Sequence, residues 1–295
     1  MKVFVTGASG WIGSASVRQL LDAGHTVVGL ARSEVSARAV TALGAQVQRG
    51  SLDDLDGLRA GAAGCDAVVH LGYDHDFSQM ERAAQTDRQV IDALGSAMEG
   101  TGGALVVASG TVGLTSEGVG TERDRPDPSS HPRIANAAAA LALADGGVRS
   151  VVIRFAPTVH GAGDHGFVAT LVQIARDKGV SAYLGDGSNR WPAVHRDDAA
   201  HLVRLAVEGA PAGSVLHAVA EEGVSTRAIA EAIGRGLGLP VASVPVEQAY
   251  DHFGWMGLFF GLDMPASHAL TSELLGWEPT GPDLLADLAT GSYTG

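Results

Sequence analysis

Three glycines that follow the first apolar run of the chain carry its clearest chemical signal. Gly7, Gly10 and Gly13 stand between the run Val3–Thr6 and an amphipathic stretch that begins at Ile12. Glycines let a backbone approach a pyrophosphate closely, and a helix N-terminus offers free N–H groups and the positive end of a dipole. A strand, a glycine turn and a helix start in this order predict a dinucleotide site. The alternative is an ordinary glycine turn in an α/β protein.

The end of the second apolar run bears on which dinucleotide would bind. A site for NAD places an acid there to hold the ribose hydroxyls, but Ala31 stands in that place, and Arg32 and Ser33 follow. A guanidinium matches a phosphate in charge and in geometry. We therefore expect NADP(H) to be preferred over NAD(H), with Arg32 and Ser33 among the cofactor-binding residues. The alternative is that Arg32 is a solvated surface charge.

The elements that must position these residues alternate along the first half of the chain. Strands are predicted at Val3–Thr6, His25–Ala31, Gln46–Arg49, Ala67–Leu71, Ala104–Ala108 and Ser150–Phe155, and helices at Val35–Leu43, Leu55–Gly61, Phe77–Met98 and Ala135–Ala144. Strands that are apolar nearly throughout are buried on both faces, which predicts a parallel sheet covered by helices. The fold class is therefore α/β, a doubly wound parallel sheet whose ligand lies beyond the carboxyl ends of the strands.

After Phe155 the pattern changes and glycine- and histidine-containing loops appear. Helices are predicted at Phe167–Lys178, Asp197–Glu208 and Thr226–Leu237, strands at Ser181–Leu184 and Ser214–Ala218, and loops for most of the rest. We expect residues 1–157 to form the dinucleotide-binding domain, with residues 193–219 returning to it. Residues 158–192 and 220–295 would form a smaller C-terminal lobe that binds the substrate.

Composition narrows the possible partners and compartments. The chain has 295 residues, 45% of them hydrophobic and 18% charged, which is typical of a globular protein. The formal net charge of −13 argues against nucleic acid or an anionic membrane as a partner, because both need a basic face. The single cysteine, Cys65, excludes an intramolecular disulfide and indicates a reducing compartment, so we expect a cytoplasmic protein. The apolar stretch Phe253–Leu262 is too short to span a bilayer.

Further short sequences extend the pattern along the chain. They are Gly-Ser-Leu-Asp at 50–53, Val-His-Leu-Gly at 69–72, Val-Ala-Ser-Gly-Thr at 107–111, and the segments Arg154–Gly161 and Gly185–Ala200. Together with the TGxxGxxG sequence at Thr6–Gly13, this series resembles the extended and atypical, NAD-dependent epimerase/dehydratase-like branch of the short-chain dehydrogenase/reductase superfamily. The resemblance covers nearly the whole chain and implies a Rossmann-type fold, an NAD(P)-dependent oxidoreductase and a small-molecule substrate.

The resemblance also implies roles for particular residues. The glycine turn would cradle the pyrophosphate, and the ends of later strands would line the rest of the cofactor. The implied residues are Gly7, Ser9, Gly10, Trp11, Ile12 and Gly13 at the pyrophosphate, Asp53 at the adenine, Leu71, Gly72 and Tyr73 along the ribose and nicotinamide, and Phe155 and Ala156 at the carboxamide, with Leu52 as a further cofactor-binding residue.

The chain departs from this family at the usual catalytic pair, a tyrosine and a lysine spaced as YxxxK. Its tyrosines are Tyr73, Tyr183, Tyr250 and Tyr293, and none of them begins such a sequence. By spacing, Ser129 and Arg133 stand near the expected places. Serine is a weak acid, however, and arginine does not readily shuttle a proton.

Other side chains would therefore act on a substrate carbonyl. Ser109 and Thr111, just beyond the fifth strand, would position its oxygen, and Tyr73 or His131 would donate a proton. Tyr73 could instead pack on the cofactor, and His131 could be an exposed loop residue; water or the cofactor ribose would then supply the proton. By residue type a metal site is a weaker alternative, which no metal-binding motif supports. Its ligands would come from His70, Asp74, His75 and Asp76, or from His160, Asp164 and His165.

Aromatic residues are concentrated in Asp251–Leu262. This stretch could form an apolar wall over the substrate, or it could be lobe core or the contact of a homodimer. The expected activity is NADP(H)-dependent hydride transfer to a small, apolar carbonyl or other unsaturated compound. The alternatives are a regulator that binds NADP(H) without catalysis and, ranked last, a sugar-nucleotide epimerase or dehydratase.

Overall fold

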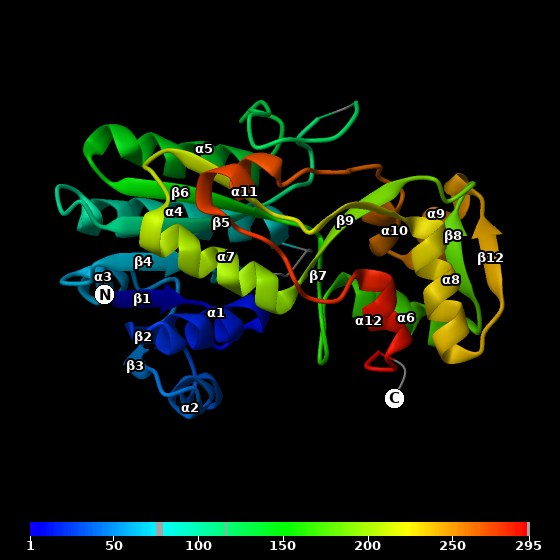
Figure 1. Ribbon diagram of the computed structural model, residues 1–295, viewed down its shortest axis with the longest axis horizontal. Helices are drawn as coiled ribbons and strands as arrows, with labels where there is room; N and C mark the ends of the chain where they lie inside the picture. The colour runs from blue at the N-terminus through cyan, green and yellow to red at the C-terminus, as the bar shows by residue number, and fades with distance from the viewer. Residues whose placement is uncertain (75–78, 116, 294–295) are drawn as a thin grey trace.

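The computed structural model describes residues 1–74, 79–115 and 117–293, and within them seven parallel strands form the central sheet (Figure 1). They are β1 (Lys2–Thr6), β2 (Thr26–Ala31), β3 (Gln46–Arg49), β4 (Ala67–His70), β5 (Ala104–Gly110), β6 (Arg149–Phe155) and β10 (Ser214–Ala218). Their order across the sheet is β10-β6-β5-β4-β1-β2-β3. The direction of strand order therefore switches between β1 and β4, which is where open α/β sheets bind their ligands.

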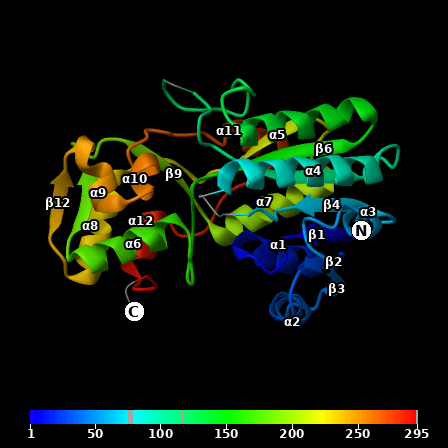
Figure 2. The ribbon, with the colours of Figure 1, turned by 180° about the vertical axis from the view of Figure 1, so that it is seen from behind.

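Helices cover both faces of this sheet because its strands are apolar on both sides. One face packs against α1 (Trp11–Asp22), α2 (Glu34–Ala42) and α7 (Arg196–Gly209), and the other against α3 (Leu55–Ala62), α4 (Met80–Met98) and α5 (Pro132–Ala142). Figure 1 shows α1 and α7 in front of the sheet, and Figure 2, seen from behind, shows α4 and α5. The predicted fold class, a doubly wound α/β sheet, is confirmed.

Most predicted elements of this half agree with the structure to within a few residues. The bounds of β3 match the prediction, whereas β5 continues beyond Ala108 to Gly110. The helix predicted from Phe77 is described from Met80 onward, since residues 75–78 lie outside the described part. α5 begins at Pro132 rather than Ala135, because proline suits the first helical position and His131 caps the helix. Among the described residues, no helix combines the length and apolarity needed to cross a membrane.

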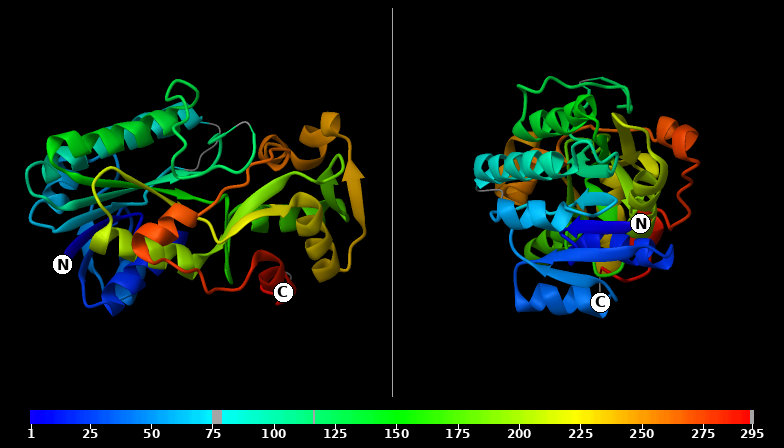
Figure 3. Two further views of the ribbon diagram at one scale, coloured as in Figure 1. Left: turned by 45° about the horizontal axis from the view of Figure 1, so that its top comes forward. Right: turned by 90° about the vertical axis from the view of Figure 1, so that its left-hand side faces the viewer.

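Part of the chain after Phe155 builds a smaller lobe at one end of the central sheet, whereas α7 and β10 return to that sheet (Figure 3). Strands β7 (Thr158–His160), β9 (Arg190–His195) and β11 (Glu221–Ser225) form one sheet in the order β11-β9-β7, and β8 (Ser181–Leu184) pairs with β12 (Val241–Val244). The lobe core is filled largely from α6 (Phe167–Lys178) and α8 (Thr226–Leu237). The predicted domain boundaries stay predictions.

The expectation of loops to the end of the chain is wrong at several short elements. Where loops were predicted, or no strand or helix was, the structure has β7, β9, β11 and β12, followed by α9 (Ala249–Phe253), α10 (Met256–Phe260), α11 (Ala269–Leu275) and α12 (Leu284–Ala289). Helices of five to seven residues are too short to be stable alone, so no local periodicity announces them. They persist because Phe253, Met256 and Leu284 are buried in the lobe core.

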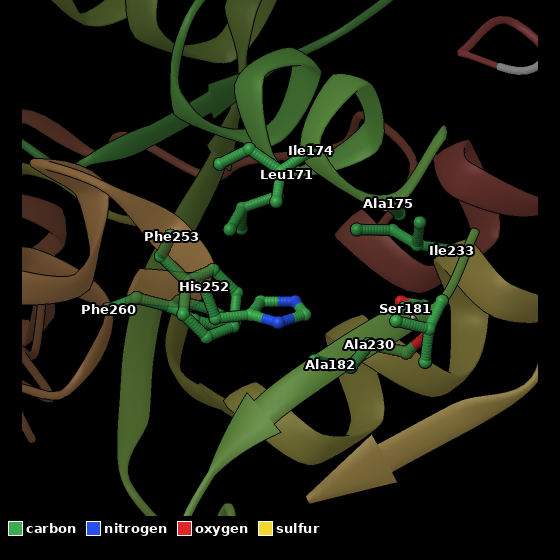
Figure 4. A pocket seen from close by; sticks show the side chains of 11 residues that line it. Leu171, Ile174, Ala175, Ser181, Ala182, Ala230, Ile233, His252, Phe253 and Phe260 are labelled. Carbon is green, nitrogen blue, oxygen red and sulfur yellow. Dashed lines mark hydrogen bonds between the residues drawn. The ribbon is translucent and has the colours of Figure 1, made fainter. Parts of the chain in front are cut away.

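The aromatic stretch Asp251–Leu262 is divided between the interior and the surface. Phe253, Met256 and Phe260 are buried in the lobe core, whereas Leu258 is 72% exposed and Trp255 is 38% exposed. The imidazole of His252 points into a small apolar void, shown in Figure 4, with a volume of about 10 Å³. Such a void holds at most about one water molecule, so it belongs to the packing of the lobe and is not a substrate pocket.

Candidate active site

The turn after β1 has a geometry that glycine alone satisfies. Gly7 has φ +67°, and a Cβ added to it would lie 2.7 Å from the amide nitrogen of Gly72. A Cβ added to Gly13 would lie 2.0 Å from the carbonyl oxygen of Gly7. The amide of Gly10 donates to that same carbonyl at 2.9 Å, and Gly10 is the N-cap residue of α1, which has no side-chain cap. The first amides of α1 therefore stay available for an anion such as a pyrophosphate.

A chain of buried polar groups lies beneath this turn. The amide of Gly72 donates to Oγ1 of Thr6 at 3.1 Å, and this hydroxyl lies 2.7 Å from Nδ1 of His70. Nε2 of His70 lies 3.1 Å from Oδ1 of Asp87, whose other oxygen accepts a hydrogen bond from Asn136 at 2.7 Å. The chain ties β1, β4, α4 and α5 together directly behind the contact between Gly7 and Gly72.

One assignment of hydrogens satisfies every member of this chain. Thr6 donates to Nδ1 of His70, whose Nε2–H donates to Asp87, and Asn136 donates both to Asp87 and to the carbonyl of Ala84. Burial alone would raise the pKa of Asp87, but the hydrogen bonds and charges of its neighbours lower it below its ordinary value. A buried carboxylate is therefore retained under the cofactor turn.

Tyr73 and Arg133 meet beyond the ends of β4 and β5. The Arg133 guanidinium carbon lies 3.9 Å from the centre of the Tyr73 ring, and Nη2 makes a long contact of 3.5 Å with the carbonyl of Ala108. Burial raises the pKa of Tyr73, and the charge of Arg133 partly opposes that shift. Ser129 instead lies in an exposed turn, where its amide and hydroxyl both bind Asp127.

The other catalytic candidates differ in burial. Ser109 is half-buried at the end of β5, whereas Thr111 is 2% exposed and its Oγ1 has no hydrogen-bond partner among the described residues. Nδ1 of His131 accepts from the amide of Arg133 at 3.1 Å, which makes His131 the N-cap of α5. Burial and the charge of Arg133 lower the pKa of His131. The capping bond gives His131 a structural use that its place in the sequence did not suggest.

Residues predicted to bind the adenosine end surround the ends of β2 and β3. Arg32 is exposed, and with the described residues it makes no hydrogen bond or ion pair. Ser33 caps α2 through a reciprocal pair of hydrogen bonds with Ser36. Asp53 is exposed, and a Cβ on Gly72 would lie 3.2 Å from the side chain of Leu52. Leu52 and Gly72 are thus brought together, as a shared binding surface requires.

Phe155 and Ala156 are buried at the end of β6, where their backbone groups already have partners. The carbonyl of Phe155 accepts from the amide of Thr111 at 3.1 Å, and the amide of Ala156 donates to Ala218 at 3.1 Å. These bonds hold Thr111 against β6. Their predicted contact with a carboxamide, like the roles of Leu71 and Ser9, stays a prediction.

Trp11 joins the glycine turn to the lobe. Its indole donates to the carbonyl of Val159 at 2.7 Å, and the guanidinium carbon of Arg196 lies 4.2 Å from the ring centre. Nε of Arg196 also donates to the Trp11 carbonyl at 2.7 Å. Ile12, the next residue, packs against the main core. Trp11 therefore fixes the position of the turn relative to β7 and α7.

The histidine and acid clusters have partners other than metals. His160 pairs with Asp287 at 2.9 Å, and Tyr293 donates to Asp164 at 2.9 Å. Burial raises the pKa of both Asp164 and Tyr293. Among the described residues, no three His, Cys, Asp or Glu side chains are arranged to hold a metal ion. His75 and Asp76 lie outside the described part of the chain.

Three aromatic side chains of the lobe contact one another. They are those of Phe167, Trp255 and Phe259, with ring centres 5.7 to 6.0 Å apart. Val112, the residue after Thr111, packs against the same lobe core. The residue that follows Thr111 in the chain therefore belongs to the lobe core, as two of these rings do.

Residues 3–218 match the model of the NAD dependent epimerase/dehydratase family. The chain belongs to this family. The family resemblance read from the short sequence motifs is therefore confirmed, and members of this family and their relatives are NAD(P)-dependent oxidoreductases and epimerases.

Curated relatives of this epimerase/dehydratase-family chain include proteins of very similar length. An uncharacterised protein of Schizosaccharomyces pombe is 49% identical over 294 residues, which cover 99% of this chain and all of the relative. An uncharacterised protein of Saccharomyces cerevisiae is 42% identical over 98% of both chains. The 2-alkyl-3-oxoalkanoate reductase of Stenotrophomonas maltophilia is 29% identical over 72% of this chain and 67% of the reductase.

Solved structures share the fold of this family member at low identity. A dTDP-glucose 4,6-dehydratase from Streptomyces venezuelae, with NAD bound, has a TM-score of 0.77 at 23% identity and covers 99% of this chain and 96% of its own. The UDP-glucose 4-epimerase of Thermotoga maritima, with UDP-glucose bound, also has a TM-score of 0.77, at 19% identity over 99% and 97% of the chains. At these identities the likeness establishes the fold alone.

Sequence reasoning about this family member missed the two residues that complete the buried chain. Asp87 and Asn136 lie on α4 and α5, far in sequence from the glycine turn. A local signal did exist for Asp87, because it falls on the apolar face of α4 between Ala84 and Val90. A carboxylate at a position that a helix buries requires a partner, and this requirement could have pointed to His70.

Proposed function

We propose that this chain is an NADP(H)-dependent oxidoreductase that transfers a hydride to a small, apolar carbonyl or other unsaturated compound. The observation that carries the proposal is Arg32, an exposed guanidinium without a described partner at the end of β2. β2 pairs with β1, so Arg32 follows the strand next to the one that leads into the glycine turn. Amides for a pyrophosphate and a cation for a 2′-phosphate then belong to one site.

The residues of the chain would divide the reduction of a carbonyl among them. When bound, NADPH would supply the hydride to the carbonyl carbon. Ser109 and Thr111 would donate hydrogen bonds to the carbonyl oxygen, and Tyr73 would give it a proton as negative charge develops there. The raised pKa of Tyr73 keeps its phenol protonated at neutral pH, and Arg133 would stabilise the phenolate that remains.

An aromatic group of the lobe supports an apolar substrate. Phe167 and Phe259 pack against the same lobe core as Val112, and the Trp255 ring contacts both of them. Aromatic rings favour the burial of alkyl or aromatic groups. The related reductase of Stenotrophomonas maltophilia is named for a 2-alkyl-3-oxoalkanoate, an alkyl-substituted carbonyl compound, and this name is consistent with the proposal.

The first experiment measures the binding of the cofactor and the turnover of substrates separately. Purified protein is titrated with NADPH and NADH by calorimetry, and NADPH oxidation is then followed with a panel of aldehydes, ketones, enones and imines. We expect tighter binding of NADPH than of NADH, and turnover with at least one apolar member of the panel. Failure to bind either nucleotide would overturn the proposal.

A second candidate, an NADP(H)-binding regulator without catalysis, is favoured by one observation. The place of the family tyrosine is taken by Ser129, which is exposed and bound to Asp127. The same titration and panel separate the two candidates, because a regulator would bind NADPH and turn over none of the compounds.

A further inference from the structure

Trp11, the first residue of α1, lies against the segment that runs from β7 to α6. Its indole Nε1 donates to the carbonyl of Val159 at 2.7 Å. The ring centre of His165 lies 5.7 Å from that of the indole, with the two planes at 79°. A Cβ added to Gly161 would lie 3.5 Å from Cζ2 of Trp11, and one added to Gly163 would lie 3.9 Å from Cζ3. This linking segment therefore contacts a side chain of the glycine turn at several points.

Two side chains from the last described part of the chain hold the linking segment in place. The hydroxyl of Tyr293 accepts a hydrogen bond from the amide of Gly161 at 3.2 Å and donates one to Oδ2 of Asp164 at 2.9 Å. The amide of Asp164 also donates to the carbonyl of Gly161 at 3.1 Å, which closes a turn between them. Nδ1 of His160 lies 2.9 Å from Oδ2 of Asp287 on α12. A single hydroxyl therefore bridges the two ends of the turn that lies against the indole.

These contacts are shielded from water. Tyr293, Asp287 and His160 are buried, and Nη2 of Arg176 on α6 donates to the carbonyl of Tyr293 at 3.3 Å. Without the Tyr293 hydroxyl, the amide of Gly161 would lose the acceptor that it has in the structure. A buried amide is costly to leave unpaired, so the linking segment would have to move toward water. Such a movement would also displace the indole that the segment contacts.

We propose that Tyr293 is a positioning residue for the cofactor site, which acts on the glycine turn through the linking segment and Trp11. This inference rests on the proposed function, because it concerns the amides that would bind the pyrophosphate of the cofactor. The amide of Trp11 is one of the first amides of α1, and the contacts of the indole fix where it lies. NADPH and NADH share the pyrophosphate, so a displaced turn should weaken both nucleotides alike. Arg32, in contrast, would act on the 2′-phosphate of NADPH alone.

The first part of the test is spectroscopic and needs no cofactor. Nuclear magnetic resonance of the nitrogen-labelled protein detects the indole N–H groups, and the Trp11 signal is the one that Trp11→Phe removes. In Tyr293→Phe this signal should shift and exchange faster with solvent, while the signals of the buried Trp191 and Trp277 stay in place. A loss of packing throughout the protein would move all three. Tyr250→Phe is the matched control, because Tyr250 is 72% exposed.

The second part is calorimetry with NADPH and with NADH. We expect both dissociation constants to rise about threefold or more in Tyr293→Phe, with their ratio unchanged. The effects of Tyr293→Phe and Trp11→Phe should not add, because both substitutions act on the same contact between the linking segment and the turn. Asp164→Ala breaks the bond of the Tyr293 hydroxyl from the other side and should reproduce both effects. A cooperative unfolding transition shows that each variant is folded.

Two outcomes would overturn the inference: a Trp11 signal that moves no more in Tyr293→Phe than in Tyr250→Phe, or additive effects of Tyr293→Phe and Trp11→Phe on affinity. A loss of affinity for NADPH alone would contradict it as well, since the pyrophosphate is common to both nucleotides. Failure of the proposed function would appear separately, as a wild type that binds neither nucleotide or oxidises no NADPH across the carbonyl panel. The indole signal would still show whether Tyr293 positions Trp11.

Discussion

Nε2 of His70 lies 3.1 Å from Oδ1 of Asp87, and the two side chains are only 1% and 6% exposed. The pair joins the end of β4 to the middle of α4, and through Thr6 it reaches the backbone of Gly72. A Cβ added to Gly7 would lie 2.7 Å from the amide nitrogen of Gly72, so the position of Gly7 has no room for a side chain. The floor of the proposed cofactor site thus depends on a buried carboxylate that is distant in sequence.

Removal of Asp87 should destabilise the protein strongly. Asp87→Ala leaves the Nε2–H of His70 and an N–H of Asn136 buried without a partner, and each buried donor left unsatisfied costs about 1–3 kcal/mol in the free energy of unfolding. The measurement is urea unfolding followed by circular dichroism. Asp92→Ala on the same helix is the control, because Asp92 is 54% exposed in its pair with Arg88 and should change stability by about 1 kcal/mol or less. Equal effects of the two substitutions would contradict the prediction.

The same carboxylate predicts the direction of an acid dependence. The pKa of Asp87 is lower in the folded protein than in the unfolded chain, so its stabilisation is complete above the unfolded value of about 4. It is lost as the pH falls through the lower folded value, because the unfolded chain binds the proton more tightly. The difference in unfolding free energy between wild type and Asp87→Ala should therefore shrink toward low pH. A difference that grows on acidification would disprove this assignment.

A substitution in the glycine turn should weaken the binding of the cofactor. Gly13→Ala brings a Cβ to 2.0 Å from the carbonyl of Gly7, so the turn must open and its amides must move. We expect the Kd for NADPH to rise about tenfold or more, measured by calorimetry. Gly209→Ala at the end of α7 is the matched control, because its added Cβ would meet no atom within 4 Å. Unchanged NADPH binding in Gly13→Ala would count against the proposed site.

Arg32 should govern the choice between the two nicotinamide nucleotides. Arg32→Ala removes a charge-assisted hydrogen bond to a 2′-phosphate, worth about 1.5–3 kcal/mol, so the Kd for NADPH should rise about tenfold or more while that for NADH stays the same. Arg38→Ala removes another exposed arginine nearby, on α2, and should leave the ratio of the two constants unaltered. A parallel loss of affinity for both nucleotides would show that Arg32 does not read the phosphate.

Replacement of Thr111 should make the protein more stable and less active. Its Oγ1 is buried without a described partner, so Thr111→Val should raise the free energy of unfolding by about 1 kcal/mol. If the hydroxyl positions the substrate oxygen, kcat/KM should fall about 100-fold in the same variant. Thr115→Val, in an exposed turn, should leave kcat/KM unchanged. A more stable Thr111→Val with full activity would remove Thr111 from the proposed mechanism.

Local patterns in the sequence were sufficient to predict many of the helices and strands. The helices at Phe167–Lys178 and Thr226–Leu237 have the predicted bounds, because each presents a continuous apolar face and ends at a glycine in the left-handed conformation. Short helices such as Ala249–Phe253 were missed, since packing rather than periodicity stabilises them. Arg133 was expected near the active site from its spacing, and its contact with Tyr73 is consistent with that place.

The sequence by itself determined the order of strands and helices along the chain, the glycine turn and the family. These depend on neighbouring residues and on the backbone conformations that glycine alone adopts readily. Only the tertiary structure decided that Asp87 and Asn136 support that turn and that the side chain of Arg190 forms an ion pair with Asp263. These partners are separated by up to 73 positions, as for Arg190 and Asp263. Contacts at such separations follow from how whole helices and strands pack, which no local pattern encodes.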